Sequence, residues 1–270
     1  MSEEWLNNPA EISRRIHSSN AYRIYTRLLT LDTNFFVFDK NYRDLKLAID
    51  AFSQPEKIHL LSDNRESQII LYHMVRFVHN YLAAAKTLID HTRTMINDWY
   101  KHTDFLGEYK EQIKTRFTNN ELAGFIEDLR NYALHYSLPI TGFRLQVTMN
   151  PETREQSERI TFFIEKKSLL KWSNWSKGKG YLQTANTEIV IEQIVDEYYR
   201  QVIEFHGWMH KRLDEIHFIE LQWLDRMDQR LKELMTPIYD RMEYKTLPTN
   251  ELNSENSNTK LKPAQPPAEG

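Results

Sequence analysis

The chain has no cysteine among its 270 residues, which excludes a disulfide framework, a thiolate metal site and a thiol nucleophile. Its seven glycines stand singly, apart from the Gly178-Lys179-Gly180 pair, so they form neither a phosphate-cradling loop nor a dinucleotide fingerprint. The Gly-x-Ser-x-Gly elbow of serine hydrolases is also missing. These absences exclude the commonest nucleotide-dependent and serine-hydrolase enzymes and leave few enzyme classes.

Long apolar runs and a large net charge are missing as well. No uncharged apolar run approaches the roughly 20 residues that span a bilayer, and the first residues, Met1 to Trp5, lack the basic-then-apolar order of a signal peptide. The net charge of -3 argues against a broad basic face, so any contact with nucleic acid would have to be local. We therefore expect a soluble cytoplasmic protein with no membrane association and no cofactor.

Apolar residues repeat at three and four positions through the first half of the chain, which predicts amphipathic helices. Each predicted helix has a start or stop signal of its own, such as the Asp63 and Glu66 capping pair or a closing proline. The first predicted helix begins at Pro9 and has a break near 18–20. The next three cover 35–52, about 65–100 and 104–116. A fifth helix follows, with Asn119 or Asn120 as its cap and Pro139 at its end.

The period changes to two after residue 140. Apolar residues alternate with polar ones over 143–149 and again over 160–164, which predicts a β-hairpin with a long loop. Because a lone hairpin is marginally stable, it should lie on the helices or on a partner chain.

A helical stripe follows from Ile191 to Leu234. An unbroken helix of that length would measure about 65 Å, more than a compact domain of this size, so we expect it to break near Gly207 or to project and pair with another subunit. Residues 246–270 are polar and rich in proline, and we expect a disordered tail there.

The most specific chemistry lies in the predicted helix that ends at Pro139, where Arg130, Asn131 and His135 occur close together. An imidazole titrates near neutrality and serves as a general acid or base, a role worth about 10²–10⁴-fold in rate. A guanidinium offers a planar fork for phosphate oxygens, and an amide can orient a phosphate or an imidazole. On a helix Asn131 and His135 share a face, while Arg130 lies about 140° around from His135, so the three side chains would flank a groove.

This Arg-x4-His spacing, with a polar residue directly after Arg130 and a long amphipathic helix before it, resembles the HEPN superfamily over roughly residues 65–139. The resemblance implies a mainly α-helical HEPN-like bundle at 1–140, followed by a β-hairpin and long C-terminal helices packing on it at 141–245. It also implies a metal-independent RNA endonuclease of the toxin or phage-defence type. Two such helices would face each other in a homodimer, and a toxin-antitoxin system would add a neutralising partner protein.

A non-catalytic interpretation remains open beside this one. Arg130 would then pair with a carboxylate such as that of Asp128, and His135 would be a polar residue at a helix end. Many HEPN-like domains are not nucleases, so the protein would be a helical interaction module that recruits a protein partner through its C-terminal stripe.

A second stretch combines basic and aromatic side chains without an acidic residue. Lysines can contact phosphates while aromatic rings stack on bases, which favours single-stranded RNA. The residues predicted to bind RNA are Lys166, Lys167, Lys171, Trp172, Trp175, Lys177 and Lys179. The other interpretation, which we favour, makes the tryptophans core anchors and the lysines solvated.

His206 and His210 have the spacing of two metal ligands on one helix turn. The zinc-protease motif requires a glutamate directly after the first histidine, and Gly207 stands there instead. We therefore predict no metal site.

Overall fold

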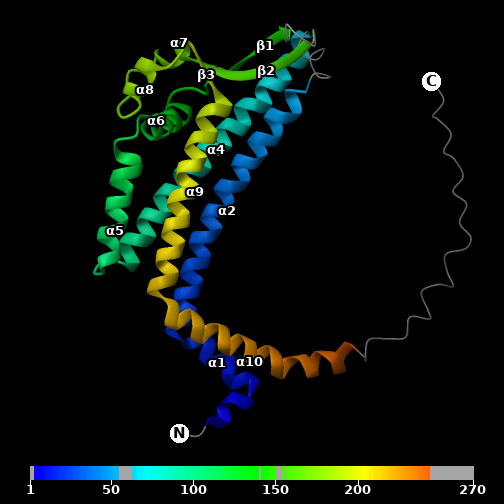
Figure 1. The fold of residues 1–270 in the computed structure, drawn as a ribbon, viewed down its shortest axis with the longest axis vertical. Helices are drawn as coiled ribbons and strands as arrows, with labels where there is room; N and C mark the ends of the chain where they lie inside the picture. The colour runs from blue at the N-terminus through cyan, green and yellow to red at the C-terminus, as the bar shows by residue number, and fades with distance from the viewer. Residues whose placement is uncertain (1–2, 55–62, 140, 150–153, 155, 244–270) are drawn as a thin grey trace, which may run out of the picture. The chain divides into compact units, whose positions relative to one another are not determined.

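A computed structural model describes residues 3–54, 63–139, 141–149, 154 and 156–243, so the predicted tail at 246–270 lies outside the described residues. The protein is mainly helical with a small three-stranded antiparallel sheet (Figure 1). The chain divides into a larger unit, Ile24–Phe218, and a smaller one that combines Met1–Arg23 with Ile219–Gly270. None of the described helices has an apolar stretch long enough to cross a membrane.

Three long helices form the frame of the larger unit: α2 (Asn20–Phe52), α4 (Asn64–Trp99) and α9 (Ile191–Ile216), which Figure 1 shows side by side. The predicted helix at 65–100 is confirmed by α4, which begins behind the Asp63 cap. Polar contacts join α9 to both of its neighbours. Tyr81 on α4 donates a hydrogen bond of 3.2 Å to the carbonyl oxygen of Val195, and Lys46 on α2 donates one of 3.0 Å to Asp196.

A second group of helices covers the frame. The helix α5 (Asp104–Ile113) continues directly into a short π-helix, η3 (Lys114–Thr118), and α6 (Glu121–His135) follows. The Asn120 side chain caps α6 by accepting a hydrogen bond of 3.0 Å from the Ala123 amide, which confirms one of the two predicted caps. α6 packs against α4 and against the short helix α8 (Lys179–Thr184).

The predicted hairpin is confirmed by β1 (Thr141–Met149) and β2 (Gln156–Glu165), whose register pairs Phe143 with Phe162. β2 buries Ile160, Phe162 and Ile164, and the sheet packs against α9 and α4. Among the short elements that were not predicted, two adjoin this sheet. The helix α7 (Lys166–Leu169) follows β2, and β3 (Glu188–Val190) pairs with β2 just before α9 begins.

Two clusters of buried side chains make the core of the larger unit. The first takes residues from α2, α4, α6, the sheet and α9, so it draws on both sides of the domain boundary predicted at residue 140. The second lies around Tyr100, Phe105 and Phe205, near the junction of α4 with α5. Phe117 in η3 packs against both clusters.

The long C-terminal stripe belongs to two helices, so the predicted break exists, but its predicted position at Gly207 is wrong. α9 runs through Gly207 and ends at Ile216, and α10 (Phe218–Glu243) follows after His217. A glycine inside a helix costs only about 1 kcal/mol relative to alanine. The buried side chains on either side of it, Phe205 and Met209, hold the helix intact across Gly207.

The smaller unit contains a 3-10 helix, η1 (Glu3–Asn7), then α1 (Pro9–Ser18) and most of α10. Arg230 on α10 donates hydrogen bonds to the Leu6 carbonyl oxygen at 3.1 Å and to Asn7 at 2.7 Å. The predicted break near 18–20 is confirmed at Ser19, beyond which α2 continues without interruption to Phe52.

Candidate functional site

The predicted motif lies in the second half of α6. This helix buries Leu122, Phe125 and Leu129 against the core and leaves the opposite face, which includes Arg130 and Asn131, only partly covered. It ends at His135, where the backbone amide of Tyr136 still bonds to the carbonyl oxygen of Tyr132 at 3.0 Å.

Arg130 contacts its neighbour in the motif and pairs with no carboxylate in the described part of the chain. Its Nη1 donates a hydrogen bond of 3.0 Å to Oδ1 of Asn131. Its Nε is buried and has no hydrogen-bond partner among the described residues. A buried donor without a partner costs about 1–3 kcal/mol. The hydrogen bonds of Arg130 therefore do not by themselves account for the position of its side chain.

His135 is exposed at the C-terminal end of α6. No described hydrogen bond joins it to Arg130 or Asn131, so the structure brings together two of the three motif residues and leaves the third in solvent. Three large apolar side chains beside it are also exposed: Leu134 at 42%, Tyr136 at 52% and Leu138 at 50%.

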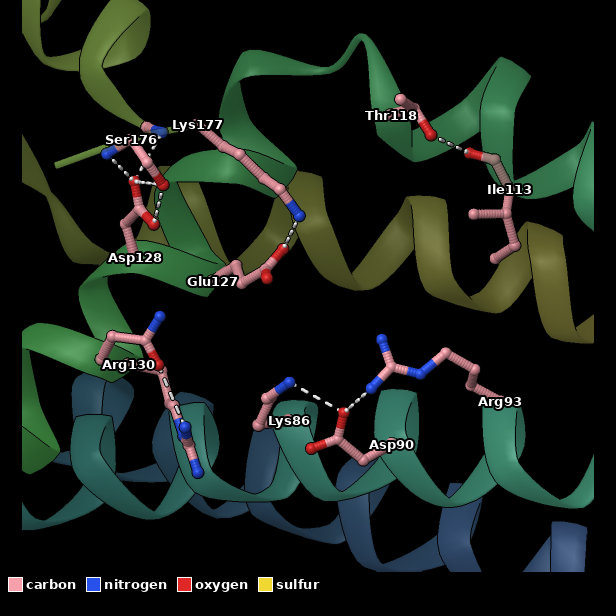
Figure 2. A network of polar contacts seen from close by, with 12 residues as sticks. Lys86, Asp90, Arg93, Ile113, Thr118, Glu127, Asp128, Arg130, Ser176 and Lys177 are labelled. Atoms are coloured by element: carbon pink, nitrogen blue, oxygen red, sulfur yellow. Dashed lines mark hydrogen bonds and ion pairs between the residues drawn. The ribbon is translucent and has the colours of Figure 1, made fainter.

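Asp128, the carboxylate named in the non-catalytic interpretation, bonds elsewhere. It is buried and accepts hydrogen bonds from the Ser176 amide at 2.8 Å, the Ser176 hydroxyl at 3.0 Å and the Gly178 amide at 2.8 Å. Figure 2 shows this contact beside the ion pair of Lys177 with Glu127, whose atoms lie 2.9 Å apart. We call residues 176–178 and Asp128 the clasp, because they hold the loop before α8 onto α6.

Glycine allows the close approach in the clasp. A Cβ on Gly178 would lie 2.6 Å from the Phe125 Cα, and one on Gly124 would lie 2.8 Å from backbone atoms of Lys177. Nothing in the spacing of the glycines along the chain indicates this contact.

The two tryptophans of the basic and aromatic stretch pack against the core. Trp175 stacks on Phe125 with ring centroids 5.7 Å apart, and its indole nitrogen donates a hydrogen bond of 2.8 Å to the Leu169 carbonyl oxygen. The Trp172 ring meets the Tyr132 ring edge-on at 5.8 Å. These contacts occupy ring surface that base stacking would need.

The lysines of that stretch are divided between structural and exposed positions. Lys166 donates a hydrogen bond of 2.7 Å to the Ala185 carbonyl oxygen, and Lys177 belongs to the clasp. Lys167, Lys171 and Lys179 are exposed. RNA binding by these lysines stays a prediction.

His206 lies in the core, whereas His210, the other histidine of the pair with metal-ligand spacing, contacts a carboxylate outside the core. The His206 ring packs 4.9 Å from Phe35 and 5.6 Å from Phe205, and burial lowers its pKa to about 3. The His210 Nε2 atom lies 3.3 Å from a carboxylate oxygen of Asp32. The described residues contain no group of three or more histidine or acidic side chains placed to hold a metal ion.

A cavity of about 340 Å³ in the larger unit is a second candidate site, which the sequence analysis missed. Its walls come from α2, α4, α5 with η3, α6 and α9, and the ion pair of Lys177 with Glu127 lies on one side of it. Across from them, Asp90 on α4 accepts hydrogen bonds from Lys86 at 2.8 Å and from Arg93 at 2.7 Å (Figure 2). The only sequence signal was that Lys86, Asp90 and Arg93 share one helix face at spacings of four and three.

Comparison of the chain with protein families, with curated proteins and with solved structures finds no match.

Proposed function

We propose that this protein is a HEPN-like, metal-independent RNA endonuclease of the toxin or defence type, with Arg130, Asn131 and His135 as its catalytic residues. The observation that carries the proposal is the pairing on α6. The carboxylate of Asp128, two residues before Arg130, accepts hydrogen bonds from Ser176 and Gly178, while Arg130 has no carboxylate partner in the described chain. An arginine kept free of ion pairs on a partly exposed face is available to a phosphate.

Each motif residue has a role that its surroundings support. The exposed imidazole of His135 would move a proton, either from the 2′-hydroxyl or to the leaving 5′ oxygen. Arg130 would stabilise charge on the phosphorus through the guanidinium donors that Asn131 does not use. Asn131 accepts from Arg130 through Oδ1, and its amide group, which bonds to none of the described residues, would donate to a phosphate oxygen.

A homodimer would complete the site. Arg130 and His135 lie about 140° apart around α6, so one helix alone flanks a groove without enclosing it. The side chains of Leu134, Tyr136 and Leu138, within three residues of His135, are exposed, and a second copy of the helix would bury them in a symmetric interface. Light scattering should therefore find a dimer, and a monomer at tens of micromolar, roughly the range of a modest interface, would contradict the shared site.

The decisive experiment measures cleavage of single-stranded RNA by the purified protein in excess EDTA. His135→Ala should reduce the rate by about two to four decades, and Arg130→Ala should also cripple it, because these changes remove proton transfer and charge stabilisation. Arg65→Ala and His102→Ala, at exposed positions outside α6, are the matched controls and should leave the rate unchanged.

Melting temperatures of the same variants separate chemistry from folding. Both motif variants should melt close to the wild type, because neither side chain holds a carboxylate in place. Absence of EDTA-resistant cleavage by a folded, dimeric wild type would contradict the nuclease proposal and favour the non-catalytic interaction module.

A further inference from the structure

The cavity between α4, η3, α6 and α9 has apolar and aromatic walls. Its lining includes Phe38, Phe117, Tyr198, Val202 and Phe205, which come from both core clusters or pack against them. At about 340 Å³ it falls within the size range of small-molecule sites, which are usually apolar clefts with a few convergent polar groups. The cavity therefore has room for a planar ring system.

Two polar atoms inside this apolar lining have no hydrogen-bond partner among the described residues. They are the hydroxyl oxygen of Thr92, whose residue is 2% exposed, and the Nδ1 atom of His206, whose residue is 4% exposed. Native interiors satisfy most such atoms, so two unsatisfied ones in the lining of one cavity require an explanation, and a polar group bound in the cavity would supply it. Burial keeps the His206 ring neutral, since it lowers the pKa of that imidazole to about 3, so its nitrogens can bond to an uncharged polar atom of a ligand.

The mouth of the cavity is positively charged. The described lining includes four cationic side chains and one carboxylate: Lys86, Arg93, Lys110 and Lys177 with Glu127. The carboxylate of Asp90 bridges Lys86 and Arg93 through a single oxygen. These three side chains together carry one net positive charge. Lys86 is held with its side chain only 20% exposed, which reduces the screening of its charge by water.

The third side of the mouth is the π-helical turn. π-turns are rare, and they occur frequently at functional sites because the extra residue re-aims side chains. Here Ile113, Phe117 and Thr118 all line the cavity, and the Thr118 hydroxyl donates a hydrogen bond of 3.4 Å to the Ile113 carbonyl oxygen (Figure 2).

We propose that this cavity is a binding site for a small organic anion with an aromatic body. The ring system lies among Phe117, Tyr198 and Phe205 and meets the Thr92 hydroxyl and the His206 ring at its buried end. The anionic group lies at the mouth between the Lys86 and Arg93 side and Lys177. Arg130, Asn131 and His135 do not line the cavity, so this site is separate from the proposed nuclease site and does not depend on it.

The test uses 8-anilinonaphthalene-1-sulfonate as the anionic probe and N-phenyl-1-naphthylamine, which has the same aromatic body without the charge, as its neutral counterpart. Fluorescence titration of the full chain should show one saturable site for the sulfonate and weaker binding of the amine. Raising the salt concentration should weaken binding of the sulfonate alone, because only its charge is screened.

Variants locate the site. The double change Lys86→Gln with Arg93→Gln should weaken sulfonate binding by about fivefold, the effect of two partly exposed charges, and leave amine binding unchanged. Lys40→Gln with Arg43→Gln is the matched control, because these two residues on α2 also form a lysine–aspartate and an arginine–aspartate ion pair within their own helix. Ala123→Phe places a ring in the cavity from α6 and should abolish binding of both probes.

The proposal is overturned if the amine binds as tightly as the sulfonate, if the Lys86→Gln and Arg93→Gln pair changes affinity no more than the control pair, or if folded Ala123→Phe protein binds the sulfonate normally. Should Ala123→Phe fail to fold, the comparison of the two charge pairs decides alone.

Discussion

His206 should make the stability of the protein depend on pH at values above those where most carboxylates titrate. The folded protein holds this imidazole in an apolar site between Phe35 and Phe205, which lowers its pKa from 6.5 to about 3, with a smaller contribution from His210 nearby. A lowered pKa means that the folded state favours the neutral imidazole over the protonated one. The folded state is therefore at full stability above the unfolded pKa and loses stability as the pH falls from 6.5 toward 3.

The size of the effect follows from the linkage. Each pH unit inside this window costs about 1.4 kcal/mol, because the unfolded chain binds a proton that the folded chain excludes. Between pH 7 and pH 5 the free energy of unfolding should therefore fall by about 2 kcal/mol. The acids whose pKa is lowered in the fold, Glu11, Asp39 and Glu108, lose their contribution only below their ordinary values near 4, so pH 5 is a suitable lower limit.

Urea denaturation at pH 7 and pH 5 measures this loss directly. His206→Leu, a change of similar volume without a titrating group, should remove most of it, whereas His102→Leu at an exposed position should keep the wild-type difference. The reasoning is refuted if the wild type loses less than about 0.5 kcal/mol, or if His206→Leu loses as much as the wild type.

Two further comparisons test the contacts around α6 and α9 by urea denaturation. Asp128→Ala should cost about 2 kcal/mol, because it leaves the buried amide of Gly178 unpaired and removes the two hydrogen bonds to Ser176, whereas Arg130→Ala should cost less than about 1 kcal/mol; equal losses would contradict the assigned pairing. Gly207→Ala should stabilise the protein by about 1 kcal/mol, since a Cβ there meets nothing within 4 Å inside α9. Gly178→Ala should destabilise it by about 1–3 kcal/mol through the clash with the α6 backbone, and a neutral result would show that the loop can move away.

Elements specified by local patterns could be predicted well from the sequence. α4 was expected at about 65–100 and spans Asn64–Trp99. The prediction is accurate because the cap and the apolar face of this helix both depend on residues that are close together in the sequence. The hairpin was predicted for the same reason, since alternation is a property of neighbouring residues. β3 has three residues, too few to show a period, and it exists only because β2 offers an edge to pair with.

The end of α9 shows how a local signal can be outweighed. Gly207 was the obvious weak point, yet the helix passes through it because Phe205 and Met209 are buried on either side. The helix ends instead at Ile216, before His217, whose ring nitrogen lies 2.8 Å from the hydroxyl of Tyr100. That contact joins residues 117 positions apart, so no window of sequence around the break could indicate it.

The same limit applies to both candidate sites. The spacing of Arg130, Asn131 and His135 is readable from the chain, but whether the arginine is free depends on where the carboxylate of Asp128 goes. Its partners lie 48 and 50 residues away in the clasp, and an amide pair with a serine hydroxyl carries no sequence signature. The cavity is still less local, since it lies where two core clusters meet. A motif therefore specifies which chemistry a helix offers, and the long-range contacts of its neighbours decide which of those groups remain available to a ligand.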